Sequence, residues 1–299
     1  MQFDREWVAR VVREALEEDV GSGDVTSLAV IPAAARAEAR IVARERGIVA
    51  GLPVAEEVFR QLSPDIHFHS LTTDGSSAQP DARVAELSGP ARDVLAGERV
   101  ALNFLQRMSG IATLTRLCVD LAAGTGVRIL DTRKTTPGLR LLEKYAVAMG
   151  GGANHRMGLY DQVLIKDNHL RALLPEAGSA PEAVRLAVSR ARKGAPTGMI
   201  VEVEAEGLEM VEAALEAGAD IILLDNMSVA EMRSAAGRVR EFREARRSDR
   251  PTTEASGGVK PDRLREVAET GVDAVSLGAL THSAPALDLA MEFAWPGRS

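Results

Sequence analysis

The first third of the chain mixes helical and strand patterns of apolar residues. Apolar positions over residues 7–16 recur at helical spacing, and Pro53 stands where a second helix, to residue 62, would begin. Short runs at 37–43, 48–51, 66–69 and 82–87 have the composition and alternation of strands. The glycines within 19–26 follow no strand, so we expect a loop there rather than a dinucleotide-binding turn. The pattern predicts a small α+β domain.

A different pattern follows a long helix that we expect over residues 93–121. Short apolar strands then alternate with helical segments. The expected strands span 127–130, 162–165, 199–203, 221–224, 253–255 and 274–277, and the expected helices span 139–149, 181–192, 208–217, 229–245 and 261–269. This alternation predicts right-handed βαβ units around a parallel sheet that is buried on both faces. Polar residues at every strand end favour a closed barrel over an open sheet.

Cationic side chains gather around two of these strand ends. Arg133 and Lys134 follow one strand, Lys166 follows the next, and His155-Arg156 lies between them after a triple glycine. Ligands of parallel sheets and barrels bind at the carboxyl ends of the strands, so we expect these five residues to line one pocket. The alternative interpretation is that they are separate, solvated loop charges.

Carboxylates follow two neighbouring strands. In the run Val201-Glu202-Val203-Glu204 one glutamate is expected to face the barrel mouth, and Asp225 ends the next strand. Glu204 and Asp225 would then lie at the same level. They can form salt bridges to cationic residues such as Lys134 and Lys166. They can also hold a hydrated Mg²⁺ and ribose hydroxyls, since Mg²⁺ prefers carboxylate ligands and retains its waters.

Two glycine-containing loops follow the last two strands. They are Ser256-Gly257-Gly258 and Ser276-Leu277-Gly278. A glycine pair between a strand and a helix exposes backbone N–H groups at the helix N-terminus, and the loops at these positions often hold phosphate in barrels. We expect a phosphate cradle here, although a lone glycine pair is also typical of a tight turn. The ligand should therefore be a phosphorylated sugar, a polyanion, or both.

Composition narrows the class of partner. The 299 residues are 45% hydrophobic and 26% charged, as in an ordinary globular protein, and the net charge of −7 argues against a nucleic-acid or membrane-surface partner. Aromatic residues make up 3% of the chain, which is too few for a base-stacking platform. No apolar run reaches membrane length and the N-terminus has no signal-peptide layout, so the expected location is the cytoplasm.

The cysteine, two histidines and the lack of a P-loop motif narrow the chemistry further. The single cysteine, Cys118, lies in an apolar helical pattern and is predicted to be a buried hydrophobic residue, with no disulfide possible within one chain. His67 and His69 would share a strand face, but two ligands without a third are a weak signal for a metal. The chain has no P-loop motif, so nucleoside triphosphate hydrolysis is not indicated.

The residues that carry this chemistry lie in long motifs. These are Asp131-Thr132-Arg133-Lys134-Thr135-Thr136-Pro137, Gly151-Gly152-Ala153-Asn154-His155-Arg156, Leu164-Ile165-Lys166-Asp167-Asn168-His169, Val201-Glu202-Val203-Glu204, Leu224-Asp225-Asn226 and Ser256-Gly257-Gly258, with further matches at 18–26, 97–103 and 278–285. In this order, and over nearly the whole chain, they resemble quinolinate phosphoribosyltransferase, also called nicotinate-nucleotide pyrophosphorylase (carboxylating).

The resemblance implies a fold and an assembly. It implies an incomplete parallel α/β barrel, of the type II phosphoribosyltransferase kind, at residues 116–283. Beside it would stand an N-terminal α+β open-sandwich domain at 1–115, joined by the C-terminal segment 284–299. It also implies a homodimer or an assembly of dimers, in which Arg99 reaches the partner's site.

The resemblance further implies a reaction that belongs to de novo NAD biosynthesis. The phosphoribosyl group of phosphoribosyl pyrophosphate is transferred to quinolinate with decarboxylation, giving nicotinate mononucleotide, CO2 and pyrophosphate, with Mg²⁺. Glu204 and Asp225 would bind the metal and would form the catalytic set together with Lys134 and Lys166. The implied substrate-binding residues are Arg99, Thr132, Arg133, Lys134, His155, Arg156, Lys166, Glu204, Asp225, Ser256, Gly257, Gly258, Ser276, Leu277 and Gly278.

Three alternatives remain open from the sequence. A paralogous phosphoribosyltransferase, of the molybdenum-utilisation type or specific for nicotinate, would be distinguished by activity on nicotinate alone. A Schiff-base lyase or aldolase would use Lys166 as its nucleophile, and borohydride trapping of substrate on Lys166 would establish it. A non-catalytic phosphosugar-binding barrel would show no turnover.

Overall fold

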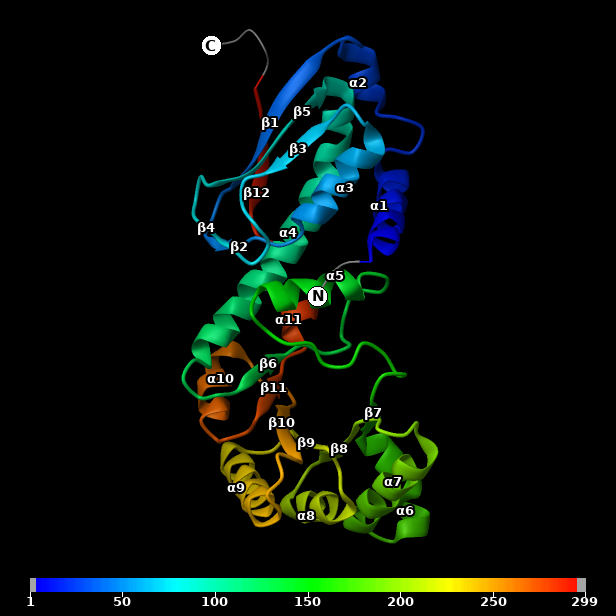
Figure 1. Cartoon of the computed structure of the whole chain (residues 1–299), viewed down its shortest axis with the longest axis vertical. Helices are drawn as coiled ribbons and strands as arrows, with labels where there is room; N and C mark the ends of the chain where they lie inside the picture. The colour runs from blue at the N-terminus through cyan, green and yellow to red at the C-terminus, as the bar shows by residue number, and fades with distance from the viewer. Residues whose placement is uncertain (1–3, 295–299) are drawn as a thin grey trace. The chain divides into compact units, whose positions relative to one another are not determined.

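The computed structural model of the chain describes residues 4–294, which form two compact units (Figure 1). Within this range, unit 1 comprises residues 4–116, 135–151 and 280–294, and unit 2 comprises residues 117–134 and 152–279. The helix expected at 139–149 thus groups with unit 1, on the other side of the boundary that we drew at residue 116. Among the helices described, none is long and apolar enough to cross a membrane.

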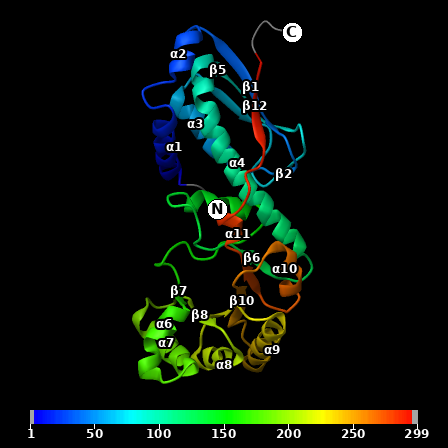
Figure 2. The same ribbon diagram turned by 180° about the vertical axis from the view of Figure 1, so that it is seen from behind.

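Unit 1 is built on an antiparallel four-stranded sheet with the order β12-β1-β5-β3. β1 (Arg36–Ala43) pairs with both β5 (Arg83–Pro90) and β12 (Leu289–Ala294), and β3 (His67–Ser70) forms one edge. Exposed and buried residues alternate along most of β1, because one face of the sheet is covered. Seen from behind, α3 and α4 lie over this face, and β12 runs beside β1 (Figure 2).

The helices of unit 1 follow local sequence signals. α3 has Pro53 in its first turn, as expected. The loop predicted over residues 19–26 overlaps α2 at Val25 and Thr26, so that prediction was wrong at these two residues. The side chain of Asp24 accepts hydrogen bonds from the N–H groups of Thr26 and Ser27, which caps the helix. The remaining elements are α1 (Arg5–Asp19), α2 (Val25–Val30), α3 (Leu52–Leu62), α4 (Ala91–Leu121), α5 (Arg140–Met149) and α11 (Ala279–His282), with a small sheet of β2 (Gly47–Ile48) and β4 (Ser77–Ala78).

The C-terminal return packs tightly against α4 in unit 1. A Cβ atom at Gly110 would lie 1.9 Å from the carbonyl oxygen of Pro285, so only glycine allows this approach. Arg107, one turn earlier, donates to the carbonyl of Thr281 and, at 2.8 Å, to the buried carboxylate of Glu143 on α5. These contacts explain why α5 and the C-terminal segment group with the first domain.

Unit 2 is an incomplete barrel of six parallel strands in the order β6-β11-β10-β9-β8-β7, with α7 to α10 along its outer face (Figure 1). Within residues 4–294, no strand pairing joins the edge strands β6 and β7. The expectation of a closed barrel was therefore wrong, and the incomplete barrel implied by the resemblance is confirmed. The elements are β6 (Arg128–Leu130), β7 (Val163–Ile165), α6 (Asp167–Ala177), α7 (Ala180–Gly194), β8 (Val201–Ala205), α8 (Leu208–Ala217), β9 (Ile221–Asp225), α9 (Val229–Arg246), β10 (Thr252–Ser256), α10 (Pro261–Ala268) and β11 (Ala274–Ser276).

The sequence did not predict α6, but it did predict that Cys118 is buried. α6 was not predicted, because Leu170 is the one residue that it buries and its apolar periodicity is correspondingly weak. Cys118 on α4 is fully buried, as predicted. Burial raises the pKa of its thiol to about 11, so the sulfur stays protonated at neutral pH.

Candidate active site

A cavity of about 590 Å³ opens at the carboxyl ends of the strands of unit 2. All six barrel strands, or the loops that directly follow them, contribute to its wall. Basic, acidic and hydroxyl side chains face it together. The lining residues are Thr132, Arg133, Lys134, His155, Arg156, Leu164, Lys166, Asp167, Glu204, Leu223, Asp225, Asn226, Glu254, Ser256, Gly257, Gly258 and Ser276.

Two guanidinium groups are held close to each other in this wall. Arg156 is only 8% exposed, and its Nη1 donates to the carbonyl oxygen of Gln162 at 3.0 Å. Burial lowers the pKa of Arg156, and the positive charge of Arg133 lowers it further. Because two like charges in a partly dehydrated wall repel each other, an anion bound between them would be strongly stabilised.

Asp131 organises the loops that carry these cations, and the sequence analysis assigned it no role. Its carboxylate is fully buried at the end of β6. It accepts hydrogen bonds from Nδ2 of Asn154 at 2.6 Å and from the backbone N–H of His155 at 2.8 Å. Residues 154–156 are thereby fixed beside the strand that leads to Arg133. Its place directly after a strand was the signal that could have identified it.

Lys166 and Glu204 form an ion pair across the ends of β7 and β8. The Lys166 Nζ lies 3.0 Å from Oε1 of Glu204, and the other carboxylate oxygen accepts the backbone N–H of Asp167 at 2.9 Å. The Lys166 side chain is 46% exposed, whereas that of Glu204 is 10% exposed. The salt bridge expected between Glu204 and Lys166 is thus present, and Lys166 lines the cavity.

Asp225 ends β9 beside Glu204 and lines the same cavity. Burial raises the pKa of Asp225, and the negative charges of Glu204 and Glu206 raise it further. A divalent cation near these carboxylates would relieve that repulsion. Oxygen donors with a net negative charge are also the ligands that Mg²⁺ prefers, so the donor set fits the expected metal.

In the glycine loop after β10, any residue other than glycine would strain the backbone. Gly257 and Gly258 have φ angles of +91° and +63°, and a Cβ atom at Gly257 would lie 2.4 Å from Oδ1 of Asn226. Together with Ser256 and Ser276 these glycines line the cavity. The loop therefore offers exposed backbone and two hydroxyl groups on the wall facing the cations.

Other predicted site residues lie in different surroundings. Leu277 is buried, and its N–H donates to the carbonyl of Leu130 at 2.9 Å, so this group is already used within the barrel. Neither Leu277 nor Gly278 is among the lining residues. Lys134 is exposed and lines the cavity, and its backbone N–H donates to Oγ1 of Thr132 at 3.1 Å. Arg99 is exposed on α4, within unit 1.

Two buried glutamates lie deeper in the barrel and were not predicted as part of the site. Glu202 is fully buried, and Glu254 is 2% exposed. Glu202 and Glu204 are two residues apart on β8, so both face the barrel interior at different depths, and alternation along the strand does not separate them. Among residues 4–294, His155, Glu202 and Glu254 are the one group of three whose ligand atoms are close enough to hold a metal ion.

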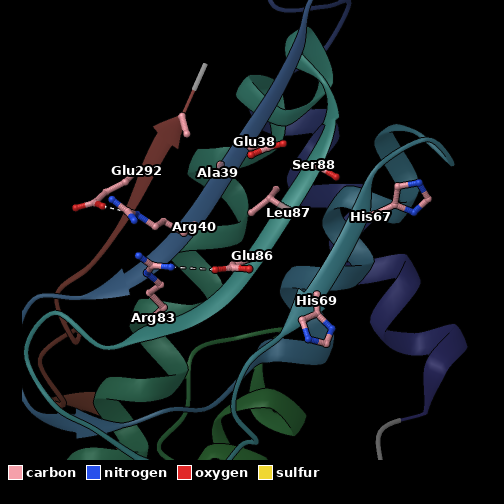
Figure 3. Close-up of a pocket in the computed structure, with 11 residues that line it drawn as sticks. Glu38, Ala39, Arg40, His67, His69, Arg83, Glu86, Leu87, Ser88 and Glu292 are labelled. Atoms are coloured by element: carbon pink, nitrogen blue, oxygen red, sulfur yellow. Dashed lines mark hydrogen bonds and ion pairs between the residues drawn. The ribbon is translucent and has the colours of Figure 1, made fainter. Parts of the chain in front are cut away.

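His67 and His69 lie elsewhere, on the exposed edge of the sheet of unit 1. Both rings project from β3 in Figure 3, near a hollow that also contains the ion pairs Arg40–Glu292 and Arg83–Glu86. Glu86 and Glu292 of this hollow are thus engaged with arginines. These histidines are not part of the metal-binding group found among the described residues.

Comparison with known proteins identifies relatives for the whole chain. A model of the quinolinate phosphoribosyl transferase N-terminal domain matches residues 24–109, and a model of the C-terminal domain of the same family matches residues 111–292. A probable nicotinate-nucleotide pyrophosphorylase (carboxylating) of Bacillus subtilis is 44% identical over 275 residues, which is 92% of this chain and 89% of that protein.

Two further relatives extend this similarity. A probable nicotinate-nucleotide pyrophosphorylase (carboxylating) of Methanothermobacter thermautotrophicus is 43% identical over 284 residues, covering 94% of this chain and 97% of that protein. The solved structure of the nicotinate-nucleotide pyrophosphorylase of Francisella tularensis superposes with a TM-score of 0.88 at 36% identity, covering 98% of each chain.

Proposed function

Because this chain belongs to the quinolinate phosphoribosyl transferase family, we propose that it transfers the phosphoribosyl group of phosphoribosyl pyrophosphate to quinolinate. Pyrophosphate and CO2 leave, and nicotinate mononucleotide is the product, so the reaction brings quinolinate into NAD biosynthesis. The observation that carries the proposal is the convergence of Arg133, Arg156 and Lys166 on one cavity that also contains Glu204 and Asp225.

The cationic wall suits an aromatic diacid. Quinolinate has two adjacent carboxylates on a pyridine ring, and arginine can bind a carboxylate through two parallel hydrogen bonds. The positive charge of Arg133 is close enough to lower the pKa of Arg156, so one small dianion can bind both residues. Lys166 follows β7, at the other edge of the sheet from β6, and its Nζ is oriented by Glu204, so it can bind a carboxylate or the pyrophosphate.

The opposite wall suits the phosphorylated sugar. The Ser256-Gly257-Gly258 loop has the left-handed backbone and open space of an anion-binding turn, and it leads to the N-terminus of α10. We propose that it binds the 5′-phosphate together with the hydroxyl of Ser276. Leu277 is left out of the proposed site because its N–H is already bonded to Leu130.

Glu204 and Asp225 are proposed to bind the ribose hydroxyls and Mg²⁺. When bound, Mg²⁺ would neutralise the pyrophosphate and make it a better leaving group. The two carboxylates stabilise the positive charge that develops on the ribose carbon as the bond to pyrophosphate lengthens and the pyridine nitrogen attacks. Stabilisation of this kind, positioned in advance, is usually the largest single contribution to catalysis.

No covalent intermediate with the protein is needed. The positive charge of the quaternised pyridine nitrogen stabilises the electron pair that stays on the neighbouring ring carbon when the carboxylate leaves as CO2. A Schiff-base lyase would require a neutral amine at Lys166, and the contact of 3.0 Å with Glu204 favours the charged amine. The ion pair therefore argues against that alternative.

The test is the release of CO2 from quinolinate labelled in the carboxylate at ring carbon 2. We expect release that requires both phosphoribosyl pyrophosphate and Mg²⁺ and that matches pyrophosphate release one for one. Nicotinate, which lacks that carboxylate, should be a poor substrate. Turnover of nicotinate alone, or no turnover of either acid, would contradict the proposed substrate.

A further inference from the structure

A cluster of three ionisable side chains lies at the buried end of the proposed site, and two of them, His155 and Glu254, line its cavity. The ligand atoms of His155, Glu202 and Glu254 all lie within 4.8 Å of one another. The His155 Nε2 is 3.1 Å from a carboxylate oxygen of Glu202 and 3.6 Å from one of Glu254. Two carboxyl groups are therefore buried together around one imidazole nitrogen, which is costly if both are charged.

The hydrogen bonds of His155 indicate that this cluster holds protons rather than a metal ion. Nδ1 of the ring accepts the backbone N–H of Arg156 at 2.8 Å, so the proton of the neutral imidazole is on Nε2. This nitrogen faces the two glutamates and has no lone pair to offer a metal. His155 consequently acts as a neutral hydrogen-bond donor here, not as one of the five cations expected from the sequence.

Glu202 and Glu254 are not equally well stabilised as carboxylates. Glu202 accepts a hydrogen bond from Nε2 of Gln162 and is the nearer of the two to Nε2 of His155. Oε1 of Glu202 and Oε1 of Glu254 both have no hydrogen-bond partner among the described residues. Burial raises the pKa of Glu254 to about 7, and the negative charge of Glu202 contributes, although the Ser276 hydroxyl and Arg128 act in the opposite direction. Glu254 is therefore partly protonated near neutral pH.

Glu254 and His155 also stand between two cavities. Both line the proposed substrate cavity, and both line a second cavity of about 310 Å³. The second cavity lies at the amino ends of the strands, since Arg128, Ile221 and Thr252 begin β6, β9 and β10 there. A proton can therefore reach Glu254 from that side while the mouth of the barrel is filled by substrate.

We propose that Glu254 donates the proton that replaces CO2 on the pyridine ring, and that it is reprotonated through the second cavity; this rests on the proposed function. The bond between the ring carbon and the carboxylate breaks reversibly, and its electron pair stays on the carbon beside the quaternised nitrogen, so CO2 is lost for good only when that carbon is protonated. That pair then forms a C–H bond with the carboxyl proton of Glu254, and the O–H pair remains on Glu254. Water in the second cavity returns the proton.

Glu254 supplies the proton donor that the loss of CO2 requires. The charged amine of Lys166 is committed to Glu204, and the guanidiniums of Arg133 and Arg156 do not release protons at neutral pH. A general acid works best when its pKa lies near the operating pH, and such groups contribute about 10²- to 10⁴-fold to rate. Glu202 and His155 serve as positioning residues that set the pKa and orientation of Glu254.

The experiment follows pyrophosphate release and CO2 release separately in a single turnover of wild type, Glu254→Gln and Glu241→Gln. Glu241 is an exposed acid on α9, so its variant is the matched control. In Glu254→Gln we expect pyrophosphate release near the wild-type rate, CO2 release slower by about 10²-fold or more, and accumulation of the carboxylated nucleotide. Glu241→Gln should resemble wild type in both steps.

The pH dependence gives a second readout that does not depend on the folding of Glu254→Gln. Wild-type CO2 release should fall as the pH rises through about 7, because the acid form of Glu254 is the active one. In Glu202→Gln this fall should move to lower pH, since removing the neighbouring negative charge lowers the pKa of Glu254. Glu254→Asp, which keeps an acid, should recover part of the CO2 release.

The outcomes separate this inference from the proposed function. Wild type that releases neither product from quinolinate would overturn the proposed function itself. Active wild type with both steps slowed equally in Glu254→Gln would show a structural role and overturn the proton donor. So would a Glu202→Gln variant whose CO2 release keeps the wild-type pH dependence.

Discussion

The Lys166 Nζ and the Glu204 Oε1 lie 3.0 Å apart, at the ends of two neighbouring barrel strands. The same carboxylate accepts the N–H of Asp167, the first residue of α6. Strand β8 thus orients both the side chain of Lys166 and the start of the helix that follows it. A single glutamate therefore fixes a cation of the proposed quinolinate site and also belongs to the proposed ribose site.

Lys166→Ala should remove a charge that is positioned before substrate binds. We expect kcat/KM for quinolinate to fall by about 10²- to 10³-fold, because removing one preorganised charge-stabilising group typically has that effect. The measurement is steady-state CO2 release. Lys193→Ala, at an exposed lysine on α7, is the control and should leave the rate unchanged. An active Lys166→Ala variant would remove Lys166 from the proposed catalytic set.

Arg99 and Lys134 test whether two subunits share a site, as proposed from the family. Arg99→Ala and Lys134→Ala should each be inactive as homodimers. After mixing, dissociation and reassociation, half the dimers contain both variants and one of their two sites is intact, so about a quarter of wild-type activity should return. The measurement is CO2 release before and after reassociation.

The matched control for this experiment pairs two residues from one cavity wall. Arg133 and Lys134 both line the cavity of unit 2, so mixed dimers of Arg133→Ala and Lys134→Ala contain no intact site and should stay inactive. If activity returned in this control, the recovery in the Arg99 experiment could not be assigned to Arg99 of one subunit completing the site of its partner. A dead Arg99→Ala and Lys134→Ala mixture would contradict a shared site.

The parts of the fold that the sequence predicted well are those with local signals. Barrel strands such as β7 and β9 are short apolar runs followed by polar residues, and the strand ends placed Arg133, Lys166, Glu204 and Asp225 correctly around one cavity. α3 was recognisable from Pro53 at its start. In each case a few adjacent residues contain the information.

The missed elements depend on distant partners or are very short. β12 is a strand because it pairs with β1, with Ala294 opposite Glu38, and nothing within its own six residues requires that pairing. α2 has six residues and one of them, Ser27, is buried, so no apolar stripe marks it. Barrel closure likewise depends on whether β6 and β7 meet, which local patterns do not specify.

The sequence did not reveal the buried part of the site. Glu202 and Glu204 have the same parity on β8, and the sequence does not reveal which of them lies at the mouth and which lies inside. Glu254 ends no strand, because Ser256 does, and so it did not stand out at all. Asp131 was similarly overlooked beside the more conspicuous Arg133.

Asp131→Asn should loosen the loop that presents His155 and Arg156. The buried carboxylate accepts hydrogen bonds from Nδ2 of Asn154 and from the N–H of His155. The side-chain amide of asparagine would place its own NH2 donor opposite one of these two donors. We expect a loss of about 1–3 kcal/mol in the free energy of unfolding, together with a higher KM for quinolinate. Urea unfolding and steady-state kinetics measure these, with the exposed Asp249→Asn as control. Unchanged stability and KM would show that Asp131 does not hold this loop.

Gly110 and Gly237 test the packing of α4 against the C-terminal return. Gly110→Ala would drive a methyl group toward the carbonyl of Pro285, 1.9 Å away, and should destabilise the protein by about 1–3 kcal/mol through forced backbone displacement. Gly237→Ala also replaces a helical glycine, but its Cβ meets nothing within 4 Å, so it should stabilise α9 by about 0.5–1 kcal/mol. If the C-terminal segment is held against α4 as described, urea unfolding should show a lower free energy of unfolding for Gly110→Ala and a higher one for Gly237→Ala. Equal, small stabilisation in both would mean that this segment can move away from the helix at little cost, because helix propensity alone would then account for both changes.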